Sequence, residues 1–279
     1  MPRVALSLVL VGCFSSYGPV ESREDMGARE MSLAERAPVD LAPVDLARPD
    51  PGVPVVWAHS STELVRFDPV ARRTDLIGAF FMRTGSAPSM TDLAVRADGA
   101  VFTVSIDSVF EVNVETAEVR VVVEDVLPGV GLSFLPPAAD GSETLLLATT
   151  TPSAIYRVDL DSGEVESLLP IGDGCFPSGD LASVLGVGTY VTLICEDDPT
   201  QDYLALVDLE ARRIERVGPI GFVEVWGLGF WGGELFGFTD FGELIAIDTS
   251  SGRGRLVIER VPGGRGFWGA GSNPNAPLR

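Results

Sequence analysis

Five short stretches of the sequence share one pattern, and this repeat constrains the fold more than any other feature. Each has an alternating apolar run, then Asp or Asn, a polar turn, and a second alternating run. Alternation on both sides of a turn predicts a β-hairpin. The oxygen of the Asp or Asn is expected to accept backbone N–H groups two residues on and so close the turn. The five turn residues are Asp68, Asn113, Asp159, Asp208 and Asp248.

The spacing of these turn residues is regular, at 45, 46, 49 and 40 residues. A period of roughly 40–50 residues is typical of a four-stranded propeller blade. A short apolar marker strand precedes each of the last four hairpins, and another apolar strand lies between marker and hairpin. The markers begin at Asp92, Gly131, Asp180 and Gly227. Each repeat is therefore predicted to form one antiparallel sheet of four strands.

The two ends of the repeat complement each other. The first repeat has no marker, because Pro54–Ala58 already corresponds to its second strand, whereas Gly266–Gly271 resembles a marker with no hairpin after it. In a closed ring, the C-terminal marker strand pairs with the second strand of the first repeat, so no strand edge is left unpaired. The sequence thus predicts an all-β fold, a five-bladed β-propeller over residues 55–274, closed by the C-terminal strand pairing into blade one. Residues 275–279 are predicted to be a disordered tail. The regular period argues against a two-sheet sandwich.

The marker strand followed by such a hairpin resembles the pattern of bacterial extracytoplasmic propellers of the quinoprotein-like and lactonase-like kind. The resemblance covers about residues 55–274 and implies the fold, without selecting one family.

The N-terminus is predicted to be a lipoprotein signal peptide, residues 1–12. Val4–Val11 is far too short to span a bilayer but matches the apolar region of a signal peptide. Leu10-Val11-Gly12-Cys13 resembles the bacterial lipobox, which implies a diacylglycerol on the thiol of Cys13 and a lipid anchor to the membrane. Phe14, in place of Asp, implies the outer membrane, at its periplasmic or surface face. The alternative is a buried N-terminal strand.

Residues 13–54 are predicted to be a lipidated Cys followed by a disordered linker. From residue 15 onward this segment is rich in Pro, repeats APVDL in tandem, and has eight acidic residues against four Arg. Such a segment cannot bury enough apolar area to fold, and its prolines favour an extended tether. The alternative, a short helix near 26–36, would be marginal alone.

Composition narrows the function. The net charge of −20 opposes binding to phosphate backbones, so nucleic acid is not expected as a partner. His59 is the only His, which argues against Ser-His-Asp catalysis and multi-His metal sites. We expect His59 to be a loop or strand-edge residue. The remaining partner classes are an unknown protein, a glycan or a small-molecule ligand.

Cys175 and Cys195 form an even pair once Cys13 is assigned to lipid. In an oxidising compartment such a pair predicts a disulfide. The loops that hold them are expected on one face of the propeller. The alternative is two separate buried thiols.

Candidate site residues cluster where the marker strands begin, at one end of the axial channel. Asp92 and Asp180 there could bind a hard cation such as Ca²⁺ or serve glycoside hydrolysis. The structural alternative is that they bond backbone N–H groups of the next blade. Trp226 and Trp268 precede marker strands, and either stack on a ligand or pack in the core. The acidic segment 196–202 is the longest polar insertion, and a partner-specific surface is expected there.

The sequence therefore favours a membrane-anchored extracytoplasmic propeller lipoprotein of the cell envelope that acts as a binding or scaffold module and is not an enzyme. The alternative is a carboxylate-based, Ca-dependent propeller hydrolase, lactonase-like or glycosidase-like. A third reading is a component of an outer-membrane assembly.

Overall fold

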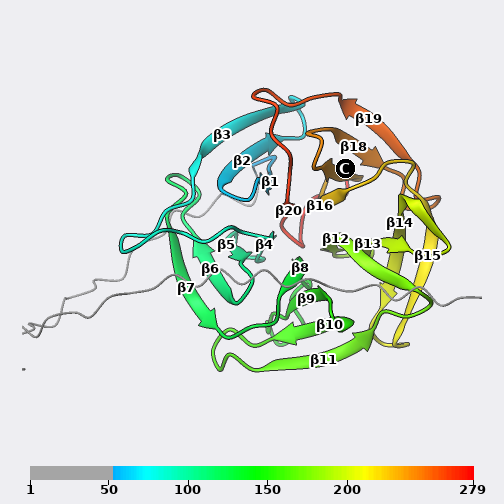
Figure 1. Cartoon of the computed structure of the whole chain (residues 1–279), viewed down its shortest axis with the longest axis horizontal. Coiled ribbons are helices and arrows are strands. Elements are labelled where there is room, and N and C mark those ends of the chain that lie inside the picture. Colours follow the sequence, from blue (N-terminus) through cyan, green and yellow to red (C-terminus); the bar gives the residue numbers. More distant parts are fainter. Residues whose placement is uncertain (1–52) are drawn as a thin grey trace, which may run out of the picture. The chain divides into compact units, whose positions relative to one another are not determined.

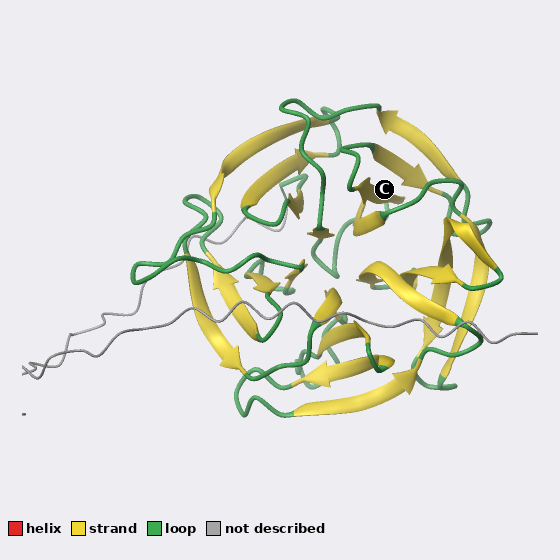
Figure 2. Cartoon of the chain, in the orientation of Figure 1, coloured by secondary structure: helices red, strands yellow, loops and turns green. Residues whose placement is uncertain are grey.

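The computed structural model describes residues 53–279, so the predicted signal peptide, Cys13 and nearly all of the predicted tether lie outside the described residues. The described chain consists of strands joined by turns and loops (Figure 2). In this range there is no helix with the length and apolarity needed to cross a membrane. The strands form five antiparallel sheets of four strands around a central axis (Figure 1). The predicted five-bladed β-propeller is confirmed.

Each blade has four strands that pair in order from the axis to the rim. Blade 1 contains β20 (Gly269–Gly271), β1 (Val56–His59), β2 (Glu63–Asp68) and β3 (Arg73–Ala79). Blade 2 contains β4 (Asp92–Val95), β5 (Val101–Val104), β6 (Ser108–Val112) and β7 (Val119–Glu124). Blade 3 contains β8 (Gly129–Phe134), β9 (Leu145–Thr150), β10 (Ser153–Val158) and β11 (Val165–Pro170). Blade 4 contains β12 (Cys175–Val184), β13 (Gly188–Cys195), β14 (Asp198–Asp208) and β15 (Arg213–Pro219). Blade 5 contains β16 (Val225–Trp231), β17 (Glu234–Thr239), β18 (Leu244–Ile247) and β19 (Gly254–Ile258).

The ring closes as the sequence predicts. Strand β20 pairs antiparallel with β1, with Trp57 opposite Gly271 and His59 opposite Gly269. Both glycines are needed because the neighbouring blade lies very close. A Cβ at Gly269 would lie 2.8 Å from Cα of Asp92, and one at Gly271 would lie 2.7 Å from the carbonyl oxygen of Leu93, both in blade 2.

The hairpin turns also follow the prediction. In all five, the predicted Asp or Asn accepts backbone N–H groups two or three residues on through Oδ1. Gly163 and Gly252 supply the left-handed residue in two turns, with φ of 75° and 78°. Arg72, Ala117 and Arg212 take the same conformation with φ between 52° and 63°. These three side chains are therefore held in a backbone region that costs about 1 kcal/mol or more.

The apolar core lies between neighbouring sheets. At the junction of blades 5 and 1, Phe67 packs edge-to-face on Phe236 and Phe238, with ring centroids 5.2 and 5.8 Å apart. Phe267, just before the closing strand, packs on Phe238 in the same way. All four rings are fully buried, so the seam that closes the ring is as apolar as a core.

The C-terminal segment is bound to one end of the propeller. Carbonyl oxygens of Pro274 and Pro277 accept the N–H groups of Leu185 and Gly232. Nδ2 of Asn273 donates to two carbonyl oxygens in the loop after β4. Asn273 and Pro274, which bond blades 2 and 4, precede the segment 275–279 that is predicted to be a disordered tail; within that segment, Pro277 bonds Gly232 of blade 5. We call this end of the propeller the tail face.

The opposite end is the open face. There each first strand begins, and there lie the loops between second and third strands and the connections between blades. It includes Ile106, Phe176, Phe241 and Trp268.

Candidate functional site

Asp92 and Asp180 lie at the axis and are fully buried. Asp92 accepts a hydrogen bond from the N–H of Leu132 in blade 3. Asp180 accepts from Leu228 in blade 5 at 2.6 Å and from Ala270 in blade 1 at 3.3 Å. Asp92 therefore ties its strand to the next blade, and Asp180 ties its strand to the next blade and to blade 1, which matches the predicted alternative of bonds to backbone N–H groups.

The two carboxyl groups also hydrogen-bond each other, although they come from blades 2 and 4. Burial raises the pKa of both groups, and the charge of Asp180 raises the pKa of Asp92 further. The pair is thus stabilised in a protonated form. Within residues 53–279, no group of three or more His, Cys, Asp or Glu gathers in a way that could hold a metal. A calcium site at this pair stays a prediction.

His59 is the last residue of β1 and is fully buried, not a loop residue. Its Nδ1 lies 2.7 Å from the carbonyl oxygen of Ser60, so this nitrogen carries the proton. Burial lowers the pKa of His59 to about 4. The neutral ring lies beside the axis and is closed off from solvent.

Trp226 and Trp268 are brought together at the open face. Their rings meet edge-to-face with centroids 5.9 Å apart and planes at 87°. Trp268 is 36% exposed and Trp226 is partly buried. The pair therefore packs against itself and still presents aromatic surface to solvent. Stacking on a ligand stays a prediction.

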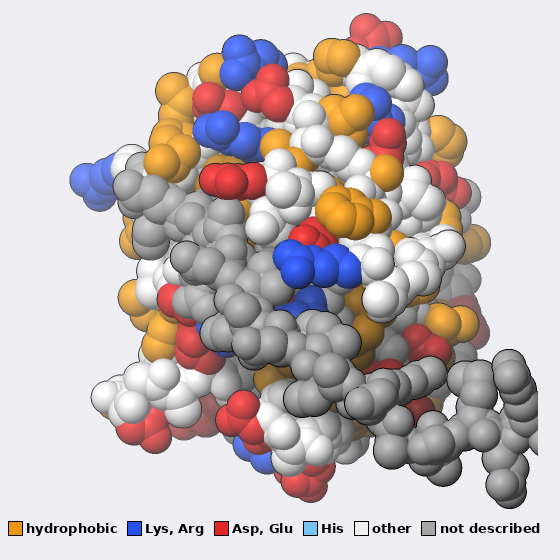
Figure 3. Space-filling view, turned by 90° about the vertical axis from the view of Figure 1, so that its left-hand side faces the viewer, with side chains coloured by type: hydrophobic (Ala, Val, Ile, Leu, Met, Phe, Trp, Pro, Cys, Tyr) orange, Lys and Arg blue, Asp and Glu red, His pale blue; other side chains and the backbone are white. Residues whose placement is uncertain are grey.

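The open face carries further exposed apolar side chains besides this pair. Ile106 is 64% and Phe241 52% exposed, and Phe176 and Trp268 are also solvent-accessible. They come from blades 2, 5, 4 and 1. On the flank shown in Figure 3, by contrast, acidic and arginine side chains are interspersed with apolar ones.

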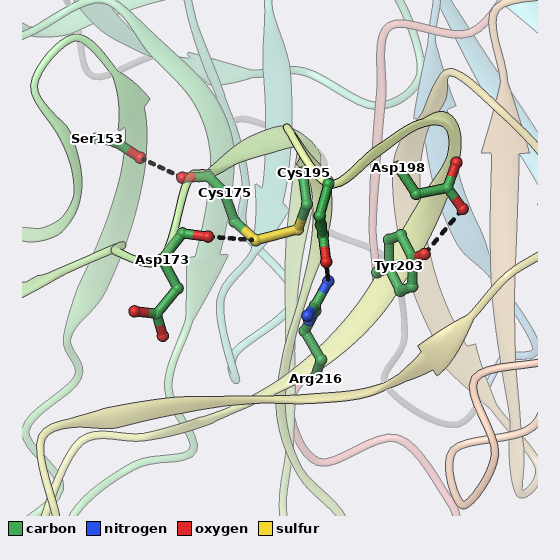
Figure 4. Close-up of a disulfide and its surroundings, with 8 residues drawn as sticks. Ser153, Asp173, Cys175, Cys195, Asp198, Tyr203 and Arg216 are labelled. Atoms are coloured by element: carbon green, nitrogen blue, oxygen red, sulfur yellow. Dashed lines mark hydrogen bonds and ion pairs between the residues drawn. A yellow bond between two sulfur atoms is a disulfide. The ribbon is translucent and has the colours of Figure 1, made fainter.

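The disulfide between Cys175 and Cys195 is present, which confirms the predicted pairing. The two residues lie directly opposite each other, where β12 begins and β13 ends. The sequence predicts a loop over 196–202, but β14 already begins at Asp198. The bond therefore ties the tip of the β13–β14 hairpin to the start of β12 on the open face (Figure 4).

Two polar contacts hold this hairpin in one conformation. Hydrogen bonds from Thr200, Gln201 and Tyr203 hold the pKa of Asp198 well below its usual range. Arg216 donates to both oxygens of Asp197 at 3.0 and 2.9 Å, and its guanidinium lies 5.2 Å from the ring centroid of Tyr203. The hairpin is thus fixed before anything binds.

A groove of about 440 Å³ separates this hairpin from blade 5. Its lining residues are Thr200, Gln201, Gly221, Phe222, Val223, Phe241 and Glu243. Sequence reasoning did not find it, because Phe222 and Phe241 lie in connections outside the repeat. The one sequence signal near it is the acidic insertion at 196–202.

No family model matches the sequence, and no curated protein matches it. Among solved structures, a chain in the crystal structure of a nidogen/laminin complex aligns with a TM-score of 0.52 at 10% identity, over 78% of this chain and 97% of that chain. A chain in the structure of U3-55K aligns at a TM-score of 0.42 and 11% identity, over 72% of this chain and 59% of that one. At this identity the first likeness supports the fold alone.

Proposed function

We propose that this protein is a lipid-anchored, extracytoplasmic β-propeller that acts as a binding module and takes a partner protein on its open face. The observation that carries the proposal is the set of exposed apolar side chains there, Ile106, Phe176, Phe241 and Trp268. Large exposed apolar surface on a soluble protein is typical of interaction sites, and these four side chains all lie on one face of the propeller.

The anchor and location are supported by sequence and redox chemistry. Leu10–Cys13 supplies the lipobox resemblance, and residues 15–54 have the composition of a tether. A disulfide between Cys175 and Cys195 suits an oxidising compartment. These features favour the cell envelope, with the propeller held off the outer membrane.

The hydrolase alternative requires carboxylates that reach a substrate. Asp92 and Asp180, on which it depended, are fully buried and bonded to backbone amides. No observation in the described residues favours it.

The anchor is tested by fractionation of cells that express the chain or its Cys13→Ala variant, grown with an alkyne fatty acid. The chain should enter the membrane fraction and take up the label, whereas Cys13→Ala should be soluble and unlabelled. A labelled or membrane-bound Cys13→Ala variant contradicts the anchor.

The binding face is tested with a photo-crosslinking amino acid at Ile106 or Phe176 on the open face, and at Leu185 on the tail face as the matched control. We expect discrete adducts from the open-face positions only. Adducts from Leu185 alone, or from none of the three, contradict the proposal.

A further inference from the structure

The groove between blades 4 and 5 combines aromatic walls with negative charge. Phe241 is half exposed and Phe222 partly buried. Of the residues that line the groove, Glu243 has a carboxylate and is partly buried; Glu224 and Asp240, also partly buried, lie in the same connections but not in the lining. The N–H of Asp240 donates to the carbonyl oxygen of Glu224 at 3.0 Å, so the two connections are in contact.

This charge is not compensated. Across residues 53–279, none of these three carboxylates forms an ion pair with an Arg. Oε2 of Glu243 accepts a hydrogen bond from Oγ1 of Thr239 at 3.2 Å, which fixes the carboxylate without neutralising it.

The groove walls are held rigid. The disulfide and the contacts of Asp198 fix the hairpin on one side. On the other side, Asp202 donates its N–H to the carbonyl oxygen of Phe222 and accepts from Ile220, while its carboxylate accepts from Val225. A surface already ordered loses less entropy when it binds a partner.

Elsewhere in the chain, an aromatic ring next to a carboxylate is bound by an arginine guanidinium. Three times, an Arg guanidinium lies 5.1–5.2 Å from an aromatic ring centroid and bonds a neighbouring carboxylate. The three sets are Arg72 with Phe236 and Glu234, Arg96 with Phe102 and Asp98, and Arg216 with Tyr203 and Asp197. The groove lining has the aromatic rings and one carboxylate, Glu243, of this arrangement, and no Arg of the described chain forms an ion pair with that carboxylate.

We propose that the groove binds an arginine side chain of the partner protein, carried in a basic segment with an apolar neighbour that packs on Phe241. The guanidinium stacks on the aromatic wall and donates to Glu243, the geometry that suits Arg better than Lys. This inference rests on the proposed function and names the chemistry of its partner. The acidic net charge of the chain favours the encounter with a basic segment.

The test uses the purified full chain and a fluorescein-labelled heptapeptide with a central Arg flanked by Phe, read by fluorescence anisotropy. The matched control peptide has citrulline, the neutral isostere, in place of Arg. The Arg peptide should bind at least tenfold more tightly than the citrulline peptide, and more weakly as salt is raised. Equal binding of both peptides, or no binding of the Arg peptide at millimolar concentration, overturns the inference.

Surface variants locate the site. Phe241→Ser and Glu243→Gln should each weaken binding of the Arg peptide at least fivefold. Leu185→Ser and Glu210→Gln, exposed positions outside the groove, should leave it unchanged. Circular dichroism checks that all four variants fold. Full affinity in both groove variants overturns the inference.

The photo-crosslinking result separates the two proposals. Adducts at Ile106 and Phe176 that persist in Phe241→Ser with unchanged yield leave the open face as the binding surface and overturn the arginine groove. Adducts only at Leu185 overturn both.

Discussion

The two faces of the propeller differ in what covers them. On the tail face, the chain's own C-terminus satisfies backbone groups of three blades, and Leu278 lies near Gly186, next to the exposed Leu185. On the open face, Ile106 and Phe241 are more than half exposed. The chain's own C-terminal segment thus covers part of the tail face, where Leu185 stays 58% exposed, whereas the exposed aromatic side chains Phe176, Phe241 and Trp268 lie on the open face. This contrast is the basis of the proposed binding surface.

Removing the closing strand should have the largest effect. A chain truncated after Arg265 loses Phe267, β20 and the tail, so β1 becomes an unpaired edge at the axis. We expect loss of the cooperative thermal transition in circular dichroism. A control truncated after Asn275 keeps the ring and loses the bond from Gly232 to Pro277, so its unfolding free energy should fall by only about 1 kcal/mol. A cooperative transition at the original temperature in the first truncation contradicts ring closure.

The disulfide lies on the open face, and its removal should lower both the stability of the chain and the affinity of the groove. The double variant Cys175→Ser, Cys195→Ser should lower the free energy of unfolding by about 3 kcal/mol, since the bond closes a loop with a sequence separation of 20 residues. Urea denaturation measures the loss. The variant should also bind the Arg peptide more weakly, because the hairpin beside the groove is less constrained. Unchanged stability and affinity would show that the brace has no role.

The stability of the chain should depend on pH through the buried titratable groups at the axis. Burial raises the folded-state pKa of Asp92 and Asp180, so the folded chain keeps protons that the unfolded chain loses above about pH 4, and stability falls as pH rises. His59 has a lowered pKa and acts in the opposite sense, with stability lost as pH falls from about 6.5 toward 4.

Between pH 7 and 8 only the acids contribute. The unfolding free energy from urea denaturation should fall by up to about 1.4 kcal/mol per pH unit for each proton held. The double variant Asp92→Asn, Asp180→Asn should show a flatter slope whatever its absolute stability. A wild-type slope of zero contradicts the buried protonated pair.

The smallest effect concerns a turn toward the rim. Arg212 has φ of 52°, and Arg212→Gly should raise the unfolding free energy by about 0.5 kcal/mol, because relief of the left-handed strain exceeds the added chain entropy. Gly252→Ala in the matching turn of blade 5 should lower it, since a Cβ there would overlap the carbonyl of Gly218. Thermal melting ranks the two variants, and the reverse order would contradict the strain argument.

The hairpins could be predicted from sequence because their turns depend on local pattern, and the ring closure because the repeat has one unmatched strand at each end. The turn oxygen of Asp68 or Asp248 bonds residues two or three positions away. The missing first strand of blade 1 had only one counterpart, at the C-terminus.

The centre of the ring could not be predicted in the same way. The starts of strands at Asp92 and Asp180 were identified, but their contact across the axis depends on how narrow the ring is. Glycines set that width: a Cβ at Gly131 would lie 2.8 Å from the carbonyl oxygen of Gly179, and one at Gly227 would lie 2.9 Å from Ala270.

The groove and the bound tail were missed for a related reason. Phe222 and Phe241 lie in connections that have no period, and the tail is held mainly by backbone carbonyl oxygens, which are the same in every residue. The acidic segment 196–202 was the one sequence feature that predicted a partner-specific surface near the groove.

Hydrogen exchange of the full chain, read by mass spectrometry with and without the Arg peptide, tests most directly whether one face is covered and the other is free to bind. The amides of Leu185 and Gly232 should be protected already and unchanged by the peptide. Added protection should be confined to 196–203, 220–224 and 240–243. Fast exchange at Leu185 and Gly232, or protection gained on the tail face, would contradict the account.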